Sequence, residues 1–252
     1  MGEGGELTVG ELIAVLSGKG GTGKTSVCAG VASALADTGA KVLCIDCDMG
    51  LRNLDISLGL ANLSALSFMD ILRGDYGLIQ ALRHPACETL YFLTAPLDCT
   101  ADQVDPELFR QMLSHARQGF DYVFLDAPAG VDAGFQLAAR FADRILLVCG
   151  PDPASVRDAA TAGEHLELMG KPEVRLVVNR VNRKLIRSLE ITVDDIMDRT
   201  GLPLLGVVPE DMHVTMAAAF QEPLLQYTNR GAAAACCRIA RRIQGYPTPI
   251  FL

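Results

Sequence analysis

The chain contains the run Gly18-Lys19-Gly20-Gly21-Thr22-Gly23-Lys24-Thr25, which fits the pattern G-x-x-x-x-G-K-[ST] of a phosphate-binding loop. An apolar run at residues 12–16 precedes it, and an alanine-rich segment at residues 24–36 follows it. A buried strand and a helix are therefore expected on the two sides, which is the context that the motif requires. The sequence predicts a nucleotide-binding loop between this strand and this helix.

This loop supplies groups that bind phosphate and Mg²⁺. Glycines allow backbone N–H groups to turn toward an anion, and the N-terminus of the following helix adds positive potential. We expect Lys24 to reach the β- and γ-phosphates and the Thr25 hydroxyl to bind Mg²⁺. A glycine-rich turn without function is the alternative, which the flanking strand and helix disfavour. The expected nucleotide contacts here are Gly18, Lys19, Gly20, Gly21, Thr22, Gly23, Lys24, Thr25 and Ser26.

The rest of the chain favours a single α/β domain over residues 1–252. Hydrophobic residues make up 50% of it, and strand and helix patterns alternate without a linker or an internal repeat. Residues 1–10 are expected to form an N-terminal extension and residues 245–252 a flexible C-terminal tail. The net charge of −8 argues against general coating of DNA, which needs many Lys and Arg contacts, although a local basic patch stays open.

Apolar periodicity and the positions of glycine and proline predict the other elements. Strands are expected at 41–46, 121–126, 144–149 and 174–179, and a short strand with its exit loop at 90–96. Helices are expected at 105–119, 154–169 and 230–244, and helical segments broken at Gly74 are expected at 62–83. This alternation is typical of a parallel sheet covered by helices.

The cysteines and histidines do not indicate a metal site. Eight cysteines occur without a secretory signal peptide, which favours a reduced, cytoplasmic protein. Cys44 and Cys47 form C-x-x-C, but residues three apart on a strand point to opposite faces, so their sulfur atoms should diverge. The four histidines are scattered along the chain and suggest neither a metal site nor a catalytic triad.

Two of the predicted strands end in aspartate. Asp46 ends residues 41–46, with Asp48 two positions later, and Asp126 ends residues 121–126. Open parallel sheets bind ligands at the carboxyl ends of their strands. We expect Asp126, beside the phosphate loop, to accept a hydrogen bond from Mg²⁺-bound water. Capping or a surface position is the alternative for Asp46 and Asp48.

Four motifs together resemble those of the MinD/ParA family of ATPases. Residues 19–25, KGGTGKT, resemble its deviant Walker A loop, and residues 46–55, DCDMGLRNLD, resemble switch I of its MinD branch. Residues 126–130, DAPAG, resemble its D-x-P-x-G switch II, and residues 207–211, VVPED, resemble the loop that closes over the base. The resemblance extends over about residues 10–244.

This resemblance implies roles for individual residues. Lys19 matches the signature lysine, which reaches across a dimer interface to the phosphates of the other subunit; a solvated loop lysine is the alternative. Asp48 would orient or deprotonate the attacking water, Asp46 would support the magnesium shell, and Gly130 would let the backbone sense the γ-phosphate. The implied catalytic residues are Lys19, Lys24 and Asp48. The implied magnesium residues are Thr25, Asp46 and Asp126.

Residues near the base follow from the same resemblance. Asn179 and Arg180 resemble the family's adenine-contacting pair, and Pro209 and Glu210 are second-rank contacts from the closing loop. Ordinary chemistry of a loop at a strand end is the alternative for all four. The chain has no N-K-x-D guanine signature, so ATP is favoured over GTP.

The implied fold is a doubly wound, mostly parallel sheet with helices on both faces, of the SIMIBI type of P-loop NTPases. The implied activity is that of an ATPase switch in division-site placement, which forms a homodimer with ATP and Mg²⁺ and binds protein regulators rather than nucleic acid. A ParA-like DNA-partition ATPase stays open. So does an electron-transfer protein of the nitrogenase iron protein type, although that function needs a cysteine after switch II, near the position of Ala133.

Membrane association is the point at which the chain differs from the MinD branch. In members of that branch, the chain continues into a basic amphipathic helix that binds the membrane surface. In this sequence, residues 245–252 contain two prolines, and their apolar run consists of the three residues 250–252. We expect weak membrane association or none. The expected location is the cytoplasm, with a peripheral position at the inner face of the cell membrane left open.

Overall fold

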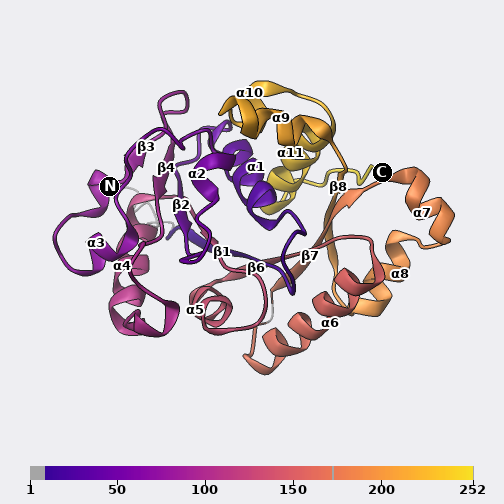
Figure 1. Cartoon of the computed structure of the whole chain (residues 1–252), viewed down its shortest axis with the longest axis horizontal. Coiled ribbons are helices and arrows are strands. Elements are labelled where there is room, and N and C mark those ends of the chain that lie inside the picture. The colour runs from indigo at the N-terminus through magenta and orange to yellow at the C-terminus, as the bar shows by residue number, and fades with distance from the viewer. Residues whose placement is uncertain (1–8, 172, 252) are drawn as a thin grey trace, which may run out of the picture.

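The computed structural model describes residues 9–171 and 173–251, and within them the chain forms an eight-stranded sheet between layers of helices (Figure 1). The strand order is β3-β4-β2-β5-β1-β6-β7-β8. The pairs are parallel except β3–β4, which is antiparallel. The strands are β1 (Glu11–Leu16), β2 (Val42–Asp46), β3 (Leu82–Arg83), β4 (Leu90–Leu93), β5 (Tyr122–Asp126), β6 (Arg144–Cys149), β7 (Val174–Val181) and β8 (Leu204–Pro209).

Helices cover both faces of this sheet (Figure 1). One face packs against α1 (Lys24–Ala36), α2 (Leu54–Ser57), α9 (Met212–Phe220), α10 (Leu224–Tyr227) and α11 (Gly231–Ile243). The other face packs against α3 (Phe68–Leu72), α4 (Pro106–Gly119), α5 (Ala133–Phe141), α6 (Pro153–Leu168) and α8 (Val193–Thr200). Helix α7 (Arg183–Leu189) and the 3₁₀ turns η1 (Leu78–Gln80) and η2 (Ala101–Gln103) complete the elements.

Strand β1 lies inside the sheet, between β5 and β6, and is buried on both faces. Ile13 and Val15 belong to the core on the α1 side, while Leu12, Ala14 and Leu16 belong to the core on the opposite side. A strand with two buried faces needs a continuous apolar run rather than alternation. The predicted strand at 12–16 and the predicted helix at 24–36 are confirmed.

The register of the sheet brings three strand ends together. Asp126 at the end of β5 pairs with Val15 of β1 on one side and with Asp46 of β2 on the other. The loop that follows β1 and the segments that follow β2 and β5 therefore leave the sheet at one edge. In open parallel sheets this edge is where ligands bind.

The prediction of helical segments broken at Gly74 in residues 62–83 is right in part. Helix α3 begins at Phe68, because Ser67 and Asp70 form a capping box there, and it ends at Leu72, two residues before Gly74 with φ +80°. Residues 78–80 form a 3₁₀ turn, and residues 82–83 form the short edge strand β3. The break at Gly74 is therefore confirmed, whereas the edge strand was not predicted.

The other predicted elements lie where they were expected, with ends displaced by at most two residues, and β4 with the loop that follows it occupies the predicted segment at 90–96. Cys44 and Cys47 belong to the cores on opposite sides of the sheet, which confirms that their side chains diverge. Stripe residues of the last helix, including Cys236 and Ile243, are buried against the sheet, as its pattern predicts.

The C-terminal tail lies against the body of the protein rather than extending freely, which corrects the prediction of a flexible tail. Arg242 on α11 donates hydrogen bonds to the carbonyl oxygens of Thr248 (2.9 Å), Pro249 (2.6 Å) and Leu205 (2.8 Å). The guanidinium of Arg238 lies 5.5 Å from the ring centre of Phe251. The predicted extension at 1–10 lies mostly outside the described residues. Among these residues, no helix has the length and apolar character needed to span a bilayer.

His84, which follows β3, is a buried histidine in a defined tautomer. Its Nδ1 accepts a hydrogen bond from Ala86 N (3.1 Å), so the proton is on Nε2, which lies 3.0 Å from the carbonyl oxygen of Leu58. Burial lowers the pKa of His84, and the bond to Leu58 only partly opposes this. The neutral ring thus links the segment after α2 to the edge of the sheet.

We predict that the contribution of His84 to the free energy of unfolding falls as the pH drops below about 6.5, the ordinary pKa of histidine. In that range the unfolded chain takes up a proton on His84 that the folded chain does not, with a slope of at most about 1.4 kcal/mol per pH unit. Urea unfolding at a series of pH values between about 5 and 8 measures the free energy of unfolding and its slope with pH. His84→Gln should lose this part of the slope, whereas the exposed control His115→Gln should keep it. An unchanged slope in His84→Gln would contradict the assignment.

Candidate nucleotide-binding site

The loop at residues 17–23 joins β1 to α1 with its glycines in a conformation that suits an anion cradle. Gly21 and Gly23 both have φ +80°, which disfavours residues with a Cβ. At Gly23 a Cβ would also collide with Nδ2 of Asn179. Within the described residues, the Thr22 hydroxyl is buried and has no hydrogen-bond partner. An orphan buried hydroxyl in such a loop fits contact with a ligand oxygen.

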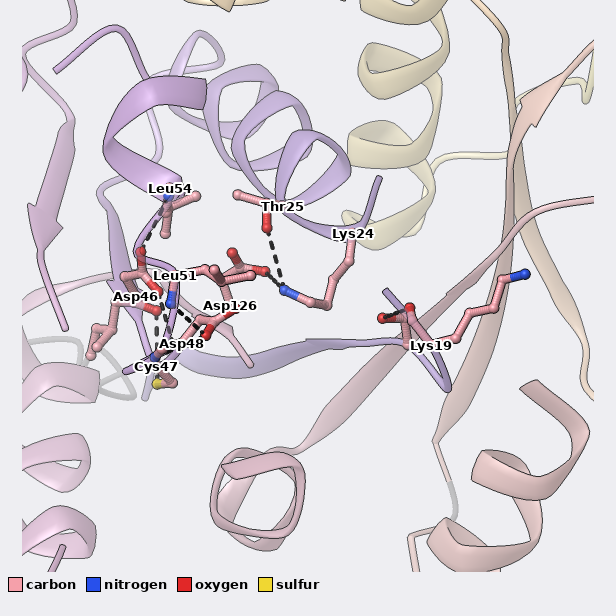
Figure 2. A network of polar contacts seen from close by, with 12 residues as sticks. Lys19, Lys24, Thr25, Asp46, Cys47, Asp48, Leu51, Leu54 and Asp126 are labelled. Carbon is pink, nitrogen blue, oxygen red and sulfur yellow. Dashed lines mark hydrogen bonds and ion pairs between the residues drawn. The ribbon is translucent and has the colours of Figure 1, made fainter. Parts of the chain in front are cut away.

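Lys24, Thr25 and Asp126 meet at the first turn of α1, as predicted (Figure 2). Lys24 Nζ lies 2.6 Å from Asp126 Oδ1 and 3.4 Å from Thr25 Oγ1. Lys24 is 6% exposed and Asp126 1% exposed, so the ion pair is buried. Burial raises the pKa of Asp126, and the Lys24 ammonium opposes that rise. Removal of either charge would leave the other buried without compensation.

Asp46 holds the turn that follows β2. Its Oδ1 accepts a hydrogen bond from Asp48 N (2.9 Å), and its Oδ2 accepts one from Leu54 N (3.2 Å) (Figure 2). Burial, together with the charge of Asp126, raises the pKa of Asp46 to about 7. Because its two oxygens bind both ends of the turn, Asp46 fixes the conformation of residues 47–53.

Asp48 lies within this turn on the side of the phosphate loop, near Asp46 and Asp126 (Figure 2). Its Oδ1 accepts hydrogen bonds from the backbone of Gly50 and Leu51, each at 3.2 Å. In the described part of the chain its Oδ2 accepts no hydrogen bond. One oxygen thus closes the turn, and the other is free to act on a ligand or a water molecule.

Lys19 does not point toward the phosphate loop of its own chain. Figure 2 shows its side chain directed away from Lys24. Lys19 Nζ lies 3.0 Å from Asp152 Oδ1, and the Lys19 side chain is 35% exposed. The same Asp152 oxygen caps α6 by accepting a hydrogen bond from Ser155 N (3.0 Å). The sequence indicates a helix start here, but the contact with Lys19 spans 133 positions and was not predicted.

The segments predicted near the base line a cavity of about 490 Å³ beside the loop. Asn179 Nδ2 donates to the carbonyl oxygen of Thr22 (2.7 Å), and Arg180 donates to that of Gly21 (3.2 Å). Arg180 also lies 3.5 Å from Glu210. The other lining residues include Gly23, Ser26, Val27, Val208, Pro209, Glu210 and Met212. This volume is typical of a small-molecule site.

Gly130, the last residue of the switch II motif, lies against the start of the loop. Its φ of +99° is a conformation that favours glycine, and its N–H donates to the carbonyl oxygen of Ser17 (3.0 Å). Contact of this N–H with a phosphate would replace the bond to Ser17. The structure therefore places Gly130 beside the loop, with its donor bound to protein.

These features together suit a nucleotide with its magnesium ion. The glycine cradle and the unpartnered Thr22 hydroxyl fit phosphate oxygens, and Thr25 with Asp126 fits a hydrated divalent cation. The adjoining cavity fits a base and its sugar. The fold and the loop thus define a P-loop nucleotide-binding protein.

Comparison with known proteins identifies the family. The sequence model of the family described as CobQ/CobB/MinD/ParA nucleotide binding domain matches residues 13–224 of this chain. The chain is 36% identical to the septum site-determining protein MinD of Bacillus subtilis over 246 residues, which cover 96% of this chain and 92% of that protein. The chain belongs to the MinD/ParA family.

Solved structures agree with this assignment. MinD in the MinC:MinD cell division protein complex of Aquifex aeolicus matches with a TM-score of 0.89 and 33% identity, covering 96% of this chain and 98% of that chain. MinD of Pyrococcus horikoshii, complexed with Mg-ADP, matches with a TM-score of 0.80 and 28% identity, covering 92% and 95%. The predicted doubly wound, mostly parallel P-loop fold is confirmed.

We predict that Lys24→Ala loses nucleotide binding, because it removes the charge that we expect to bind the phosphates. Loss of one or two charge-assisted hydrogen bonds of about 1.5–3 kcal/mol each corresponds to a Kd at least roughly 10- to 100-fold higher. Titration with a fluorescent ATP analogue and Mg²⁺ measures it, with circular dichroism to check folding. The exposed Lys41→Ala is the matched control. An unchanged Kd in folded Lys24→Ala would exclude this role.

Proposed function

We propose that this protein is an ATP-hydrolysing switch that binds MgATP, forms a homodimer with it and acts in division-site placement. The direction of Lys19, which turns away from Lys24 and its own phosphate loop, is the observation that carries the proposal. Similarity to septum site-determining MinD proteins supports the cellular role. One domain formed by residues 1–252 and a cytoplasmic location are part of the proposal.

Under this proposal, each group around the phosphate loop has a role. Backbone N–H groups from Gly18 to Ser26 hold the phosphates, and Lys24 neutralises the β/γ region after it separates from Asp126. Thr25 and Asp126 would hold the magnesium ion, and Asp46, the register partner of Asp126 in the sheet, would support the magnesium shell. Mg²⁺ supplies neutralisation of charge on the transferring phosphoryl group.

Asp48 is the residue proposed to act on the attacking water. Its Oδ1 is engaged by the backbone of Gly50 and Leu51, which fixes the carboxylate, while Oδ2 remains available. A fixed carboxylate with one free oxygen can orient a water molecule and accept its proton. Its position on the loop side of the turn supports this role (Figure 2).

The dimer would use Lys19 in place of an arginine finger. For Lys19 to reach the phosphates of a second copy, its ion pair with Asp152 must open. Both side chains are partly exposed, so the pair is weak and its opening costs little. The ion pair therefore fits a monomer in which the lysine is held ready on the outer side of the loop.

The solved relatives support a class of partner and a cofactor for this chain, and the C-terminal tail bears on membrane association. One solved relative is a MinC:MinD complex, which supports protein regulators as partners of this chain. Another contains Mg-ADP, which supports an adenine nucleotide with magnesium as the cofactor. We expect no direct contact with nucleic acid, and weak or absent membrane association, since the tail is bound by Arg242.

We predict that Lys19→Ala keeps the nucleotide affinity of the monomer but loses ATP-dependent dimerisation and hydrolysis. In the described part of the chain the Lys19 ammonium pairs with Asp152 and not with a group of the loop, so removal of this side chain should act in trans. Size-exclusion chromatography with light scattering and a phosphate-release assay measure the two effects. Asp152→Asn, which retains a helix-capping oxygen and frees the lysine, should still dimerise. A dimerising, active Lys19→Ala protein would refute the assignment.

We predict that Asp48→Asn binds MgATP normally but hydrolyses it about 100-fold or more slowly, because the base is lost. Asparagine keeps the oxygen that closes the turn, so the change isolates the charge. ATP should then trap the dimer on a sizing column. Asp48→Ala, which also loses the turn contact, should be no faster. Near-normal turnover in Asp48→Asn would move the catalytic role to Asp46 or Asp126.

A further inference from the structure

Arg52, in the turn at residues 47–53, is held by a contact outside the phosphate site. Its backbone has φ +50°, a left-handed conformation that is unfavourable for residues with a Cβ. Its guanidinium donates twice to the hydroxyl of Thr94, from Nε at 3.1 Å and from Nη2 at 2.9 Å. An unfavourable backbone persists where the surroundings hold it, and here the side chain supplies such a restraint.

Thr94 is a rigid acceptor. It follows directly after β4, it is 5% exposed, and β4 pairs in parallel with β2, the strand that leads into the turn. Its backbone is bound on both sides: Thr94 N donates to the carbonyl oxygen of Leu66 (2.9 Å), and the Thr94 carbonyl accepts from Phe68 N (3.0 Å). The hydroxyl therefore has a position fixed relative to the sheet.

The restraint on Arg52 rests on this one neutral hydroxyl. In the part of the chain that the structure describes, the guanidinium forms no ion pair, although Asp46, Asp48 and Asp55 lie within a few positions of it. These two hydrogen bonds join the turn at 47–53 to the residue that follows β4, in addition to the hydrogen bonds that the Asp46 carboxylate accepts at the end of β2. Loss of the hydroxyl would leave the far end of the turn without that attachment.

Arg52 in turn positions Asp48. Its N–H donates to the carbonyl oxygen of Asp48 (3.2 Å), and Asp48 Oδ1 closes the turn between them. Asp46 binds the backbone at both ends of the turn, and the contact between Arg52 and Thr94 adds a second attachment near the far end. The direction of the Asp48 carboxylate thus depends on two attachments, one to Asp46 at the end of β2 and one to Thr94, which follows β4.

We propose that Thr94 is a positioning residue for ATP hydrolysis, which holds the turn at 47–53 through Arg52 and so aims Asp48 at the phosphate loop. This inference rests on the proposed function only for its effect on turnover. The attachment itself is a property of the folded chain. Thr94 is distinct from the four motifs of the sequence, and no pattern around it indicates this role.

Two variants of Thr94 separate the hydroxyl from packing. Thr94→Val has nearly the same shape but no acceptor, whereas Thr94→Ser keeps the acceptor and loses a methyl group. Thr94→Val should lower kcat by about 10- to 100-fold, as expected for a displaced catalytic group, with little change in the Kd of MgADP. Thr94→Ser should stay near wild type. A Thr94→Val protein with wild-type kcat, or equal loss in both variants, would overturn the proposal.

Hydrogen exchange of the protein without added nucleotide tests the attachment independently of hydrolysis. Amides of residues 48–54 should exchange roughly two- to tenfold faster in Thr94→Val, the effect of one lost hydrogen bond, and not in Thr94→Ser. If the wild type does not hydrolyse ATP, the proposed function fails, but this measurement still decides whether Thr94 holds the turn. Unchanged exchange in Thr94→Val would refute it.

Arg52→Gln provides a second route should Thr94→Val fold poorly. It removes the other partner, so it should reproduce the faster exchange and the lower kcat with the same Kd for MgADP. The double variant should be no worse than the more affected single variant, because both changes remove one contact. Additive effects would show that the two residues act separately and would overturn the proposal.

Discussion

The buried ion pair between Lys24 and Asp126 joins the two elements on which the site depends. Lys24 begins α1 and Asp126 ends β5, so the contact at 2.6 Å fixes the loop against the edge of the sheet. Buried charges are tolerated only when they are paired, which constrains both residues at once. With Asp46 and Asp48 beside this pair, carboxylates outnumber the ammonium, an excess of negative charge that suits a divalent cation accompanying a phosphate chain.

The central part of the fold could be predicted because its signals are local. A parallel strand buried on both faces is a continuous apolar run, and the loop motif follows such a run at residue 16. Placement of Asp46 and Asp126 at one edge then followed from the rule that parallel strands end together. The segment at 62–83 was predicted only in part: its helical pieces on the two sides of Gly74 were expected, but the edge strand β3, with two residues, is too short to show a period.

Contacts between distant segments could not be predicted. Lys19 meets Asp152 and Arg52 meets Thr94 through pairings that depend on strand order, which the sequence does not state. The motifs indicated which side chains carry charge near the phosphates, but not what holds those side chains in place. Asp46 shows the difference: the pattern suggested a magnesium residue, and the structure reveals a carboxylate that also binds both ends of a turn.

The bound tail has a consequence for how the protein behaves at high concentration. Strand β8 is the last strand of the sheet, and an open strand edge invites pairing with other chains. Arg242 donates a hydrogen bond to the carbonyl oxygen of Leu205 in that strand and another to that of Pro249 in the tail. The tail segment contains two prolines, which lack the N–H donors that strand addition needs. The opposite edge, β3, has only two residues. The sheet therefore offers poor templates for edge-to-edge aggregation at both ends.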